Sequence, residues 1–285
     1  MTYVQAGGQG KMRSLTPRAA LASVLLAAAV VASASCDVKM AADGDLSVDM
    51  WHGQAQDTWS RSYTLAPGGH LEVININGQI TAEASTGPTV EVRAERSASG
   101  SSDEAAKAFL DKIEMREEVG ADRVRVETVA PRVRLGNHKV TYTIKVPAGV
   151  HVDLRTVNGG VRLENVGGEV RASSTNGGVR GRVAASSLVE ARTTNGGVEL
   201  ELTGALAADG RVLLTSVNGG VQLKVPQDTK AQVRARCTNG RVSVDDLPFT
   251  AEGEQNRRRL DGTLNGGGGR IELQTTNGGV SLGRS

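Results

Sequence analysis

Aromatic residues make up only 2% of this 285-residue chain, which holds two Trp, three Tyr and two Phe. So few rings exclude a core built on large aromatic side chains, and also the exposed aromatic platforms that sugar-binding surfaces use. After Val150 the only aromatic residue is Phe249. We therefore expect a narrow core of small aliphatic side chains, packed between two close walls with no internal cavity.

Cysteine and histidine are also scarce. The chain has two cysteines, Cys36 and Cys237, and four histidines. The histidines share no metal-ligand spacing, and two distant cysteines cannot complete a zinc site with them. We therefore predict no metal and no cofactor. The histidines are His52, His70, His138 and His151.

Motifs of known enzyme classes are missing as well. No Gly-x-Ser-x-Gly elbow occurs, and the glycine runs lack the lysine of a phosphate loop. Asp245 and Asp246 are the only adjacent Asp pair, but neighbours on a strand point to opposite faces, so we interpret them as turn residues. We expect no enzyme; a polysaccharide-active enzyme is the alternative, because glycosidases need only two well-placed carboxylates.

The charge is nearly balanced, with 33 Lys and Arg against 31 Asp and Glu. Removal of residues 1–35, which hold three basic residues and no acidic ones, leaves 30 against 31. A chain without excess positive charge is not typical of nucleic-acid binding, so no nucleic-acid partner is expected. Arg257, Arg258 and Arg259 form the only basic run, which we interpret as a solvated loop.

The first 35 residues are typical of an export signal. Arg13 and Arg18 precede an apolar run from residue 19 to 32, which is too short and too rich in Ala for a spanning helix. Translation from Met12 would give a conventional short basic start. We expect residues 1–35 to be removed on export.

Two exits from this signal compete. Ala34, Ser35 and Cys36 resemble the end of a bacterial lipobox, with Cys36 as the acylated residue, although Ser33 stands where Leu, Val or Ile is usual. The alternative is cleavage after Ala34, which would give a soluble periplasmic or secreted protein. We expect a lipoprotein in the cell envelope, anchored to the membrane through Cys36, with residues 36–60 as a tether.

A short phrase recurs along the chain. Asn-Gly, one further residue and Val occur six times, and a seventh copy has Ile80 in place of Val. Alignment on the Asn also aligns apolar positions four and six residues earlier, such as Leu154 and Val152. A period of about 20 residues is the signature of a solenoid. The seven corners are Asn77, Asn158, Asn176, Asn195, Asn218, Asn239 and Asn277.

From Val150 onward apolar and polar residues alternate on both sides of each corner. Asn-Gly between such runs also favours β-hairpins, so a hairpin meander is the rival interpretation. Column identity favours parallel coils, in which each residue lies above its equivalent in the next unit. Asn tolerates the left-handed conformation and can hydrogen-bond along a ladder of equivalent side chains, and the following Gly tolerates a positive φ.

The sequence thus predicts an all-β protein, a single-stranded parallel β-helix or solenoid of about 20-residue coils. Residues 61–149 form an N-terminal β-rich cap, and residues 150–285 the solenoid repeats. The cap contains one helix at about residues 101–112, for which Ser101 and Glu104 form a capping box. Phe109 packs this helix onto the sheet. Residues 246–269 are a longer excursion, a loop or cap near the other end.

Several segments together resemble a known family. They are Tyr-Thr-Leu (63–65), Leu-Glu-Val-Ile-Asn-Ile-Asn-Gly (71–78), the helix after residue 100, Thr-Ile-Lys-Val-Pro-Ala-Gly-Val (143–150), and the repeated Thr-x-Asn-Gly-Gly-Val-x-Leu. Over residues 60–285 the chain is similar to the DUF4097 family of bacterial adhesin-like proteins. Arg241 and Gly181 depart from its usual Gly and Leu. The resemblance implies an exported or membrane-tethered β-helical domain and supplies no catalytic residues.

We therefore expect a non-enzymatic envelope protein whose β-helix presents a polar surface to another envelope protein or to a cell-surface polymer. An interaction module in envelope-stress signalling is the alternative. The corners build the rod, so any binding surface should lie in the variable outward columns, the 246–269 excursion or the Cys36 tether.

Overall fold

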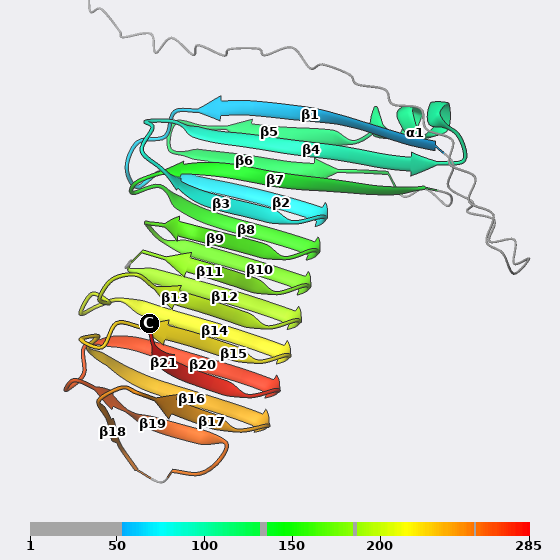
Figure 1. Cartoon of the computed structure of the whole chain (residues 1–285). Helices are drawn as coiled ribbons and strands as arrows, with labels where there is room; N and C mark the ends of the chain where they lie inside the picture. The colour runs from blue at the N-terminus through cyan, green and yellow to red at the C-terminus, as the bar shows by residue number, and fades with distance from the viewer. Residues whose placement is uncertain (1–52, 132–135, 185–186, 254) are drawn as a thin grey trace, which may run out of the picture.

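The computed structural model describes residues 53–131, 136–184, 187–253 and 255–285. The predicted signal peptide, Met12, Cys36 and His52 lie outside these residues. Within them, no helix is both long enough and apolar enough to span a membrane. The expected all-β class is confirmed: the described residues form two large, mostly parallel sheets, of ten and eleven strands, with one helix (Figure 1).

The body of the molecule is a stack of two-strand units, each contributing one strand to either sheet and turning at an Asn-Gly corner (Figure 1). The units are β2 (His70–Asn77) and β3 (Ile80–Ser85), β8 (His151–Asn158) and β9 (Val161–Val166), β10 (Val170–Asn176) and β11 (Val179–Val183), β12 (Leu188–Asn195) and β13 (Val198–Leu202), β14 (Arg211–Asn218) and β15 (Val221–Val225), β16 (Ala231–Asn239) and β17 (Val242–Asp245), and β20 (Gly269–Asn277) and β21 (Val280–Arg284).

Equivalent residues of successive units are register partners. Val170 pairs with Val152 on one side and Val189 on the other, and all three side chains are buried. Equivalent aliphatic side chains of successive units therefore stack in columns that fill the space between the two sheets. No large rings are needed, because small side chains let the two sheets approach each other. The predicted inward columns of Val, Leu and Ala are the core of the structure.

The chain does not stack its units in sequence order. The last unit, β20–β21, lies between β14–β15 and β16–β17. At the other end, β6 (Arg123–Val129) pairs with β2 and β7 (Asn137–Pro147) pairs with β3, so β2–β3 lies inside β6 and β7 rather than at the end. At both ends, therefore, the chain builds an outer layer out of sequence order.

The ends of the stack are covered by antiparallel strands. Beyond β7 lie β4 (Val90–Gly100) and β1 (Gly53–Tyr63), and beyond β6 lies β5 (Glu114–Val119). At the other end β19 (Arg259–Leu264) pairs with β16, and β18 (Phe249–Ala251) pairs with β19. Residues 246–269 thus contain an antiparallel cap beside β16, the outermost parallel strand at this end of the eleven-stranded sheet.

The helix α1 (Asp103–Leu110) packs against β1 and β4. Its N-cap is Ser102, whose hydroxyl accepts a hydrogen bond from the Ala105 N–H at 3.2 Å, so the expected capping box on Ser101 is wrong by one residue. Ser102 and the backbone also lower the pKa of Glu104, with the hydrogen bond from the backbone N–H of Glu104 as the larger cause. Phe109 is buried on the sheet, as predicted.

The prediction of a tether up to residue 60 is wrong from Gly53 onward, because β1 starts there and pairs with all of β4. Its inward face mixes apolar side chains such as Trp59 with the charged Asp57 and Arg61, so the strand resembles a linker in the sequence. Asp57 pairs with Arg96, whose guanidinium also donates to the Ile113 carbonyl at 2.7 Å. Tyr63 donates to Glu117 at 2.6 Å. Ion pairs and hydrogen bonds attach this strand together with apolar contacts to the core.

Candidate functional site

The seven corner Asn side chains form one row along the edge of the stack. Each Nδ2 donates to the Oδ1 of the Asn in the neighbouring unit, at 2.7 to 3.0 Å. The row ends at Asn77, whose Nδ2 lies 3.4 Å from Nε2 of His138. The described non-Gly residues with positive φ are Asn165, Asp246 and Asn265, so the corner Asn residues are not left-handed. The conformational reason for Asn is therefore wrong.

A second row, inside the corner, connects the units as well. Two residues before five of the corner Asn residues, an inward Thr or Ser donates its hydroxyl hydrogen to a Gly carbonyl of the neighbouring unit, as Thr193 does to Gly177 at 2.6 Å. The equivalent bonds are made by Thr156, Ser174, Ser216 and Thr275. Both corner rows thus hold the units of the stack together.

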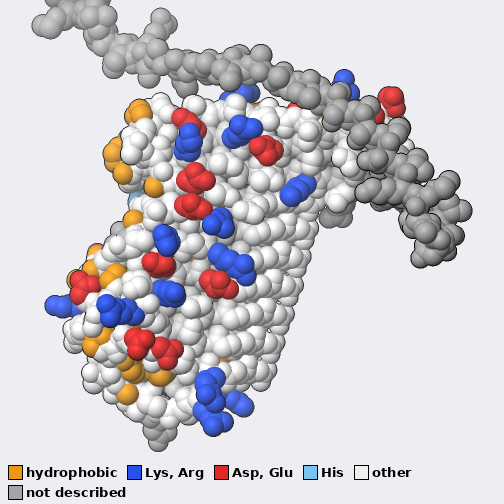
Figure 2. All heavy atoms as spheres, in the orientation of Figure 1, with side chains coloured by type: hydrophobic (Ala, Val, Ile, Leu, Met, Phe, Trp, Pro, Cys, Tyr) orange, Lys and Arg blue, Asp and Glu red, His pale blue; other side chains and the backbone are white. Residues whose placement is uncertain are grey.

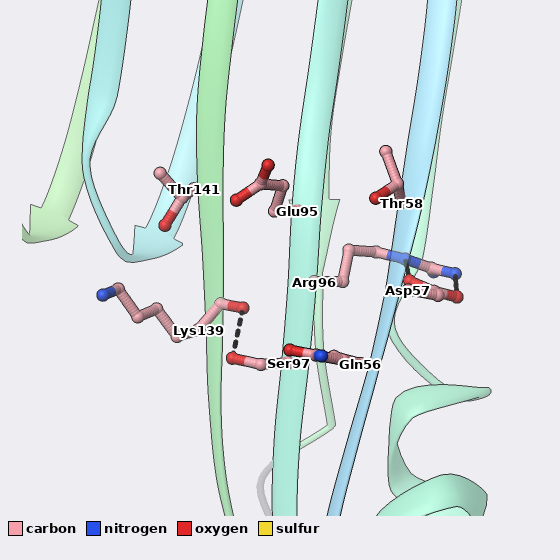
Figure 3. A pocket seen from close by; sticks show the side chains of 8 residues that line it. All are labelled: Gln56, Asp57, Thr58, Glu95, Arg96, Ser97, Lys139 and Thr141. Atoms are coloured by element: carbon pink, nitrogen blue, oxygen red, sulfur yellow. Dashed lines mark hydrogen bonds and ion pairs between the residues drawn. The ribbon is translucent and has the colours of Figure 1, made fainter. Parts of the chain in front are cut away.

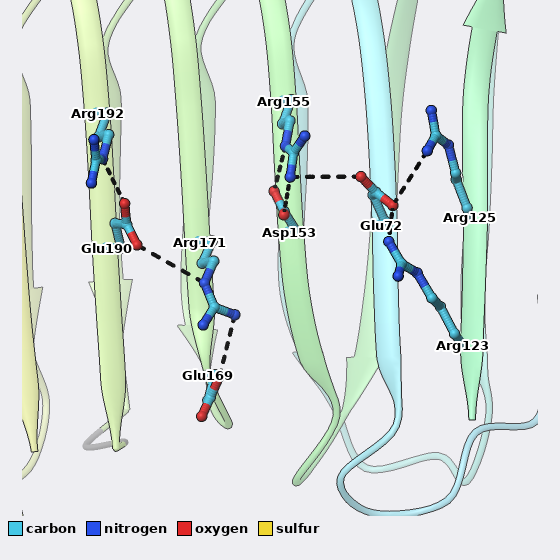
Figure 4. A network of polar contacts seen from close by, with 9 residues as sticks. All are labelled: Glu72, Arg123, Arg125, Asp153, Arg155, Glu169, Arg171, Glu190 and Arg192. Carbon is cyan, nitrogen blue, oxygen red and sulfur yellow. Dashed lines mark hydrogen bonds and ion pairs between the residues drawn. The ribbon is translucent and has the colours of Figure 1, made fainter.

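The outward face of the eleven-stranded sheet carries rows of paired charges (Figure 4). Glu72 on β2 is almost fully buried and accepts from Arg123 at 2.5 Å, and Arg155 lies 3.6 Å from its other oxygen. Arg125 completes the group at 3.9 Å. Glu72 is thus surrounded by three guanidinium groups from two neighbouring strands.

These charges are largely compensated. Arg155 also pairs with Asp153, and that hydrogen bond is the main reason for its raised pKa. The pKa of Arg125 is raised chiefly by its hydrogen bond to Glu127. Further along the face, Glu190 pairs with Arg171 and Arg192. The sequence signal for these rows is an acid five residues before the corner and an Arg three residues before it, and it occurs at two of the seven corners, Asn158 and Asn195.

An open hollow of about 450 Å³ lies on β1, β4 and β7 (Figure 3). Gln56, Thr58, Glu95 and Lys139 line it, and the Ser97 hydroxyl donates to the Lys139 carbonyl at 3.3 Å. No aromatic ring lines this hollow. The other carboxylate at its edge, Asp57, is engaged by Arg96, so the hollow does not present two free carboxylates for glycosidic chemistry.

The predicted non-ligand histidines fall in two places. The rings of His70 and His151 lie 4.8 Å apart, and Nδ1 of His151 accepts the Glu169 N–H at 2.8 Å. His138 lies edge-on to Phe109, and burial lowers its pKa. The described residues hold no group of three His, Cys, Asp or Glu that could bind a metal ion.

The other candidate residues are scattered. Asp246 has a positive φ of 56° at the end of β17, and Asp245 accepts from Ser243 at 3.1 Å, which fits the turn interpretation. Cys237 is buried in the inward Thr and Ser column, and burial raises the pKa of its thiol. Cys36, the predicted lipidation site, lies outside the described residues.

A comparison with protein-family models finds a match over residues 34–283 to the family described as Toastrack DUF4097. The chain belongs to this family.

The two departures from the repeat have local explanations within the Toastrack fold. Gly181 has a φ of 136°, and a Cβ there would lie 1.9 Å from the Leu163 carbonyl oxygen. It stands next to a register shift at Arg182 and Val183. Arg241 is in the outermost unit of its sheet.

Solved structures resemble this Toastrack domain at low sequence identity. A candidate cell adhesion protein from Clostridium sporogenes is 11% identical, with a TM-score of 0.47, over 80% of this chain and all of the other. A candidate adhesin from Bacteroides fragilis is 12% identical, with a TM-score of 0.37, over 80% and 97%. A candidate lipid-binding protein from Parabacteroides distasonis is 7% identical, with a TM-score of 0.25, over 80% and 96%. No curated protein matches the chain by sequence.

Proposed function

We propose that this Toastrack protein is an exported, lipid-anchored protein of the cell envelope, which binds a partner through the outer surface of its stack and catalyses no reaction. In this proposal the central units form a parallel β-helix that serves as a rigid rod. The observation that carries the proposal is that inward and outward residues of the repeat have different roles. Inward columns and corner rows hold the units together, whereas outward columns vary from unit to unit and carry charge.

A rod of this kind suits binding better than catalysis. A catalytic site needs groups gathered around one reacting centre, but the outward ionic groups run in rows along the sheet. Parallel strands repeat at about 4.8 Å, so a row offers the same spacing many times. Such a surface fits an extended partner, either another envelope protein or a surface polymer.

The anchor is tested by Cys36→Ser. If Cys36 carries lipid, the variant leaves the membrane fraction and appears in the soluble fraction of the envelope, because the buried acyl chains supply the membrane affinity. Cys237→Ser is the matched control, since it removes the other cysteine and should leave the protein on the membrane. Unchanged membrane association of Cys36→Ser, measured by fractionation and immunoblotting, would refute the anchor.

The partner is identified by crosslinking in living cells from outward positions such as Thr215 on β14. An envelope protein or polymer captured there, and absent with an inward label at Leu214, supports the proposal. Incubation of the purified protein with envelope glycans tests for an enzyme. Turnover that is lost in Asp245→Asn or Asp246→Asn would overturn the non-enzymatic assignment.

A further inference from the structure

Six arginines meet at the end of the stack that β16, β17 and β19 form. We call them the arginine tip: Arg234, Arg236, Arg241, Arg257, Arg258 and Arg259, all exposed. The segment before β19 brings the basic run across the last corner. The Cys237 N–H donates to the Arg258 carbonyl and the Val242 N–H to the Arg257 carbonyl, both at 2.9 Å. Arg236 and Arg259 are register partners.

Carboxylates neutralise only part of the positive charge of the arginine tip. Three of its members, Arg234, Arg236 and Arg259, share one carboxylate, Asp261, at 3.5, 4.0 and 2.5 Å. Among the residues that the structure describes, no carboxylate pairs with the remaining three tip arginines. Figure 2 shows Lys and Arg side chains gathered near this end with no acidic side chain among them.

The body of the rod is different. Most of its outward arginines have acidic neighbours on the same or the adjacent strand: Arg162 has Glu164 at 2.7 Å, Arg180 has Glu199 at 3.5 Å and Arg182 has Glu201 at 3.4 Å. The sequence is nearly neutral as a whole. The six arginines of the tip come together because β19 folds back on β16. Unpaired guanidinium groups in one place form a ready site for phosphate or carboxylate.

Arg241 extends the tip around the corner of the stack. In the five preceding units of the ten-stranded sheet its position is Gly. Three of these glycines, Gly197, Gly220 and Gly279, line a shallow hollow of about 300 Å³ that also includes Arg241. A Cβ on Gly178 would lie 3.0 Å from the next unit's carbonyl oxygen. Arg241 has no further unit of its sheet beyond it, so a long cationic side chain fits there.

We propose that the arginine tip binds a linear anionic polymer of the cell envelope, with one phosphodiester or one uronic carboxylate per repeating unit. The inference rests on the proposed function and names the partner's chemistry. The tip runs from the face of one sheet, at Arg234, to the corner of the other, at Arg241, so it matches a chain of spaced charges better than a single small anion. Arginine engages either anion through paired N–H donors.

The test uses the full chain in the Cys36→Ser background, so that the result does not depend on the anchor. Binding to polyphosphate and to polygalacturonate is measured by biolayer interferometry over a range of NaCl concentrations. The tip variant is Arg241→Gln, Arg257→Gln and Arg258→Gln together. The control is Arg162→Gln, Arg180→Gln and Arg182→Gln together, which removes the same charge from the body.

We expect the wild-type surface to bind at least one polymer, and the tip variant to bind it at least about tenfold more weakly, with a shallower salt dependence, because fewer counterions are released. The body control should lose less than about twofold. Equal losses in both variants would show a response to net charge and would overturn the proposal.

Two further probes separate other anions. Tighter binding to vesicles of phosphatidylglycerol or to duplex DNA than to either polymer would overturn the polymer assignment. The preference between polyphosphate and polygalacturonate identifies the anion. None of these results affects membrane fractionation, so failure of the arginine tip and failure of the envelope anchor are distinguishable. Circular dichroism confirms that both triple variants fold.

Discussion

At the corners, the Asn side chains link neighbouring units through hydrogen bonds between their amides. An Asn amide carries both donor and acceptor, so identical residues can bond to each other along a column, whereas an ionised Asp has acceptors only and could not continue the row. Asn195 illustrates this, because it donates to Asn176 at 2.9 Å and accepts from Asn218 at 3.0 Å. The repeated Asn in the sequence reflects this coupling between units.

Substitution of a corner inside the row should cost more than substitution at its end. Asn195→Ala removes two hydrogen bonds, so that Asn176 and Asn218 each lose one partner, and we expect a loss of about 1–2 kcal/mol in the free energy of unfolding. Asn239→Ala removes only the bond to Asn277, and we expect about half that loss. Urea unfolding measures both. Equal losses would mean that the corner conformation matters and the row does not.

The hydrogen bonds of the inward Thr and Ser row could not be predicted from the sequence, although the residues themselves recur at a fixed position in it. Alternation in the sequence places these Thr and Ser side chains on the inward face, but it does not give their hydrogen-bond partners. The acceptor of Ser216 is a Gly carbonyl in the neighbouring unit, at 2.8 Å. Identifying that bond requires the stacking, which places the two backbones together.

The two-strand unit depends on a close approach at the residue after each corner. Gly196 has a φ of 155°, and a Cβ on it would lie 2.3 Å from the Gly177 carbonyl oxygen of the neighbouring unit. Since that atom belongs to a backbone already fixed by the sheet, it cannot move aside cheaply. The glycine is therefore needed both for its conformation and for the distance between units.

Gly196→Ala separates these two needs when compared with Gly68→Ala. Gly68 also has a positive φ, 85°, but no atom within 4 Å of the added Cβ. We expect Gly68→Ala to destabilise by about 1 kcal/mol, the conformational part alone. Gly196→Ala should lose about 3 kcal/mol or more, because strain and overlap add. Thermal and urea unfolding compare them, and similar losses would show that the overlap relaxes.

Strands could be predicted from the sequence where their inward face is wholly apolar, but not where that face also carries ion-paired residues. β8 and β12 follow from their alternating Val, Leu and Ala. β1 does not, because its inward face carries Asp57 and Arg61, whose partners Arg96 and Glu117 come from other strands. The same limit applies to the arginine tip, since a near-neutral sequence hides a local excess until the chain folds back.

At the scale of the molecule, the order of units differs from the order of the sequence. The repeat gives each unit its shape but not its place, because the corner Asn and inward columns are interchangeable between units. The chain first builds the outer layer β16 to β19 and then returns to place β20–β21 beneath it. The C-terminal residues thus lie inside the stack, which matches the paired registers of β20 on both sides.

Deletion of residues 269–285 tests this arrangement. In a stack in sequence order, such a deletion would remove one end unit and shorten the rod. Here it removes a unit with two neighbours, including Ile271, Leu273, Val280 and Leu282, which are almost fully buried.

We expect a loss of more than about 5 kcal/mol, which is comparable with the whole stability of a domain. Residues 231–264 should then become sensitive to protease, because their strand β16 has lost its parallel partner. Deletion of Arg284 and Ser285 alone is the control and should change the unfolding midpoint little. A truncated chain that unfolds like the control, with residues 231–264 still protected in limited proteolysis, would contradict the observed order of units and place β20–β21 at the end of the rod.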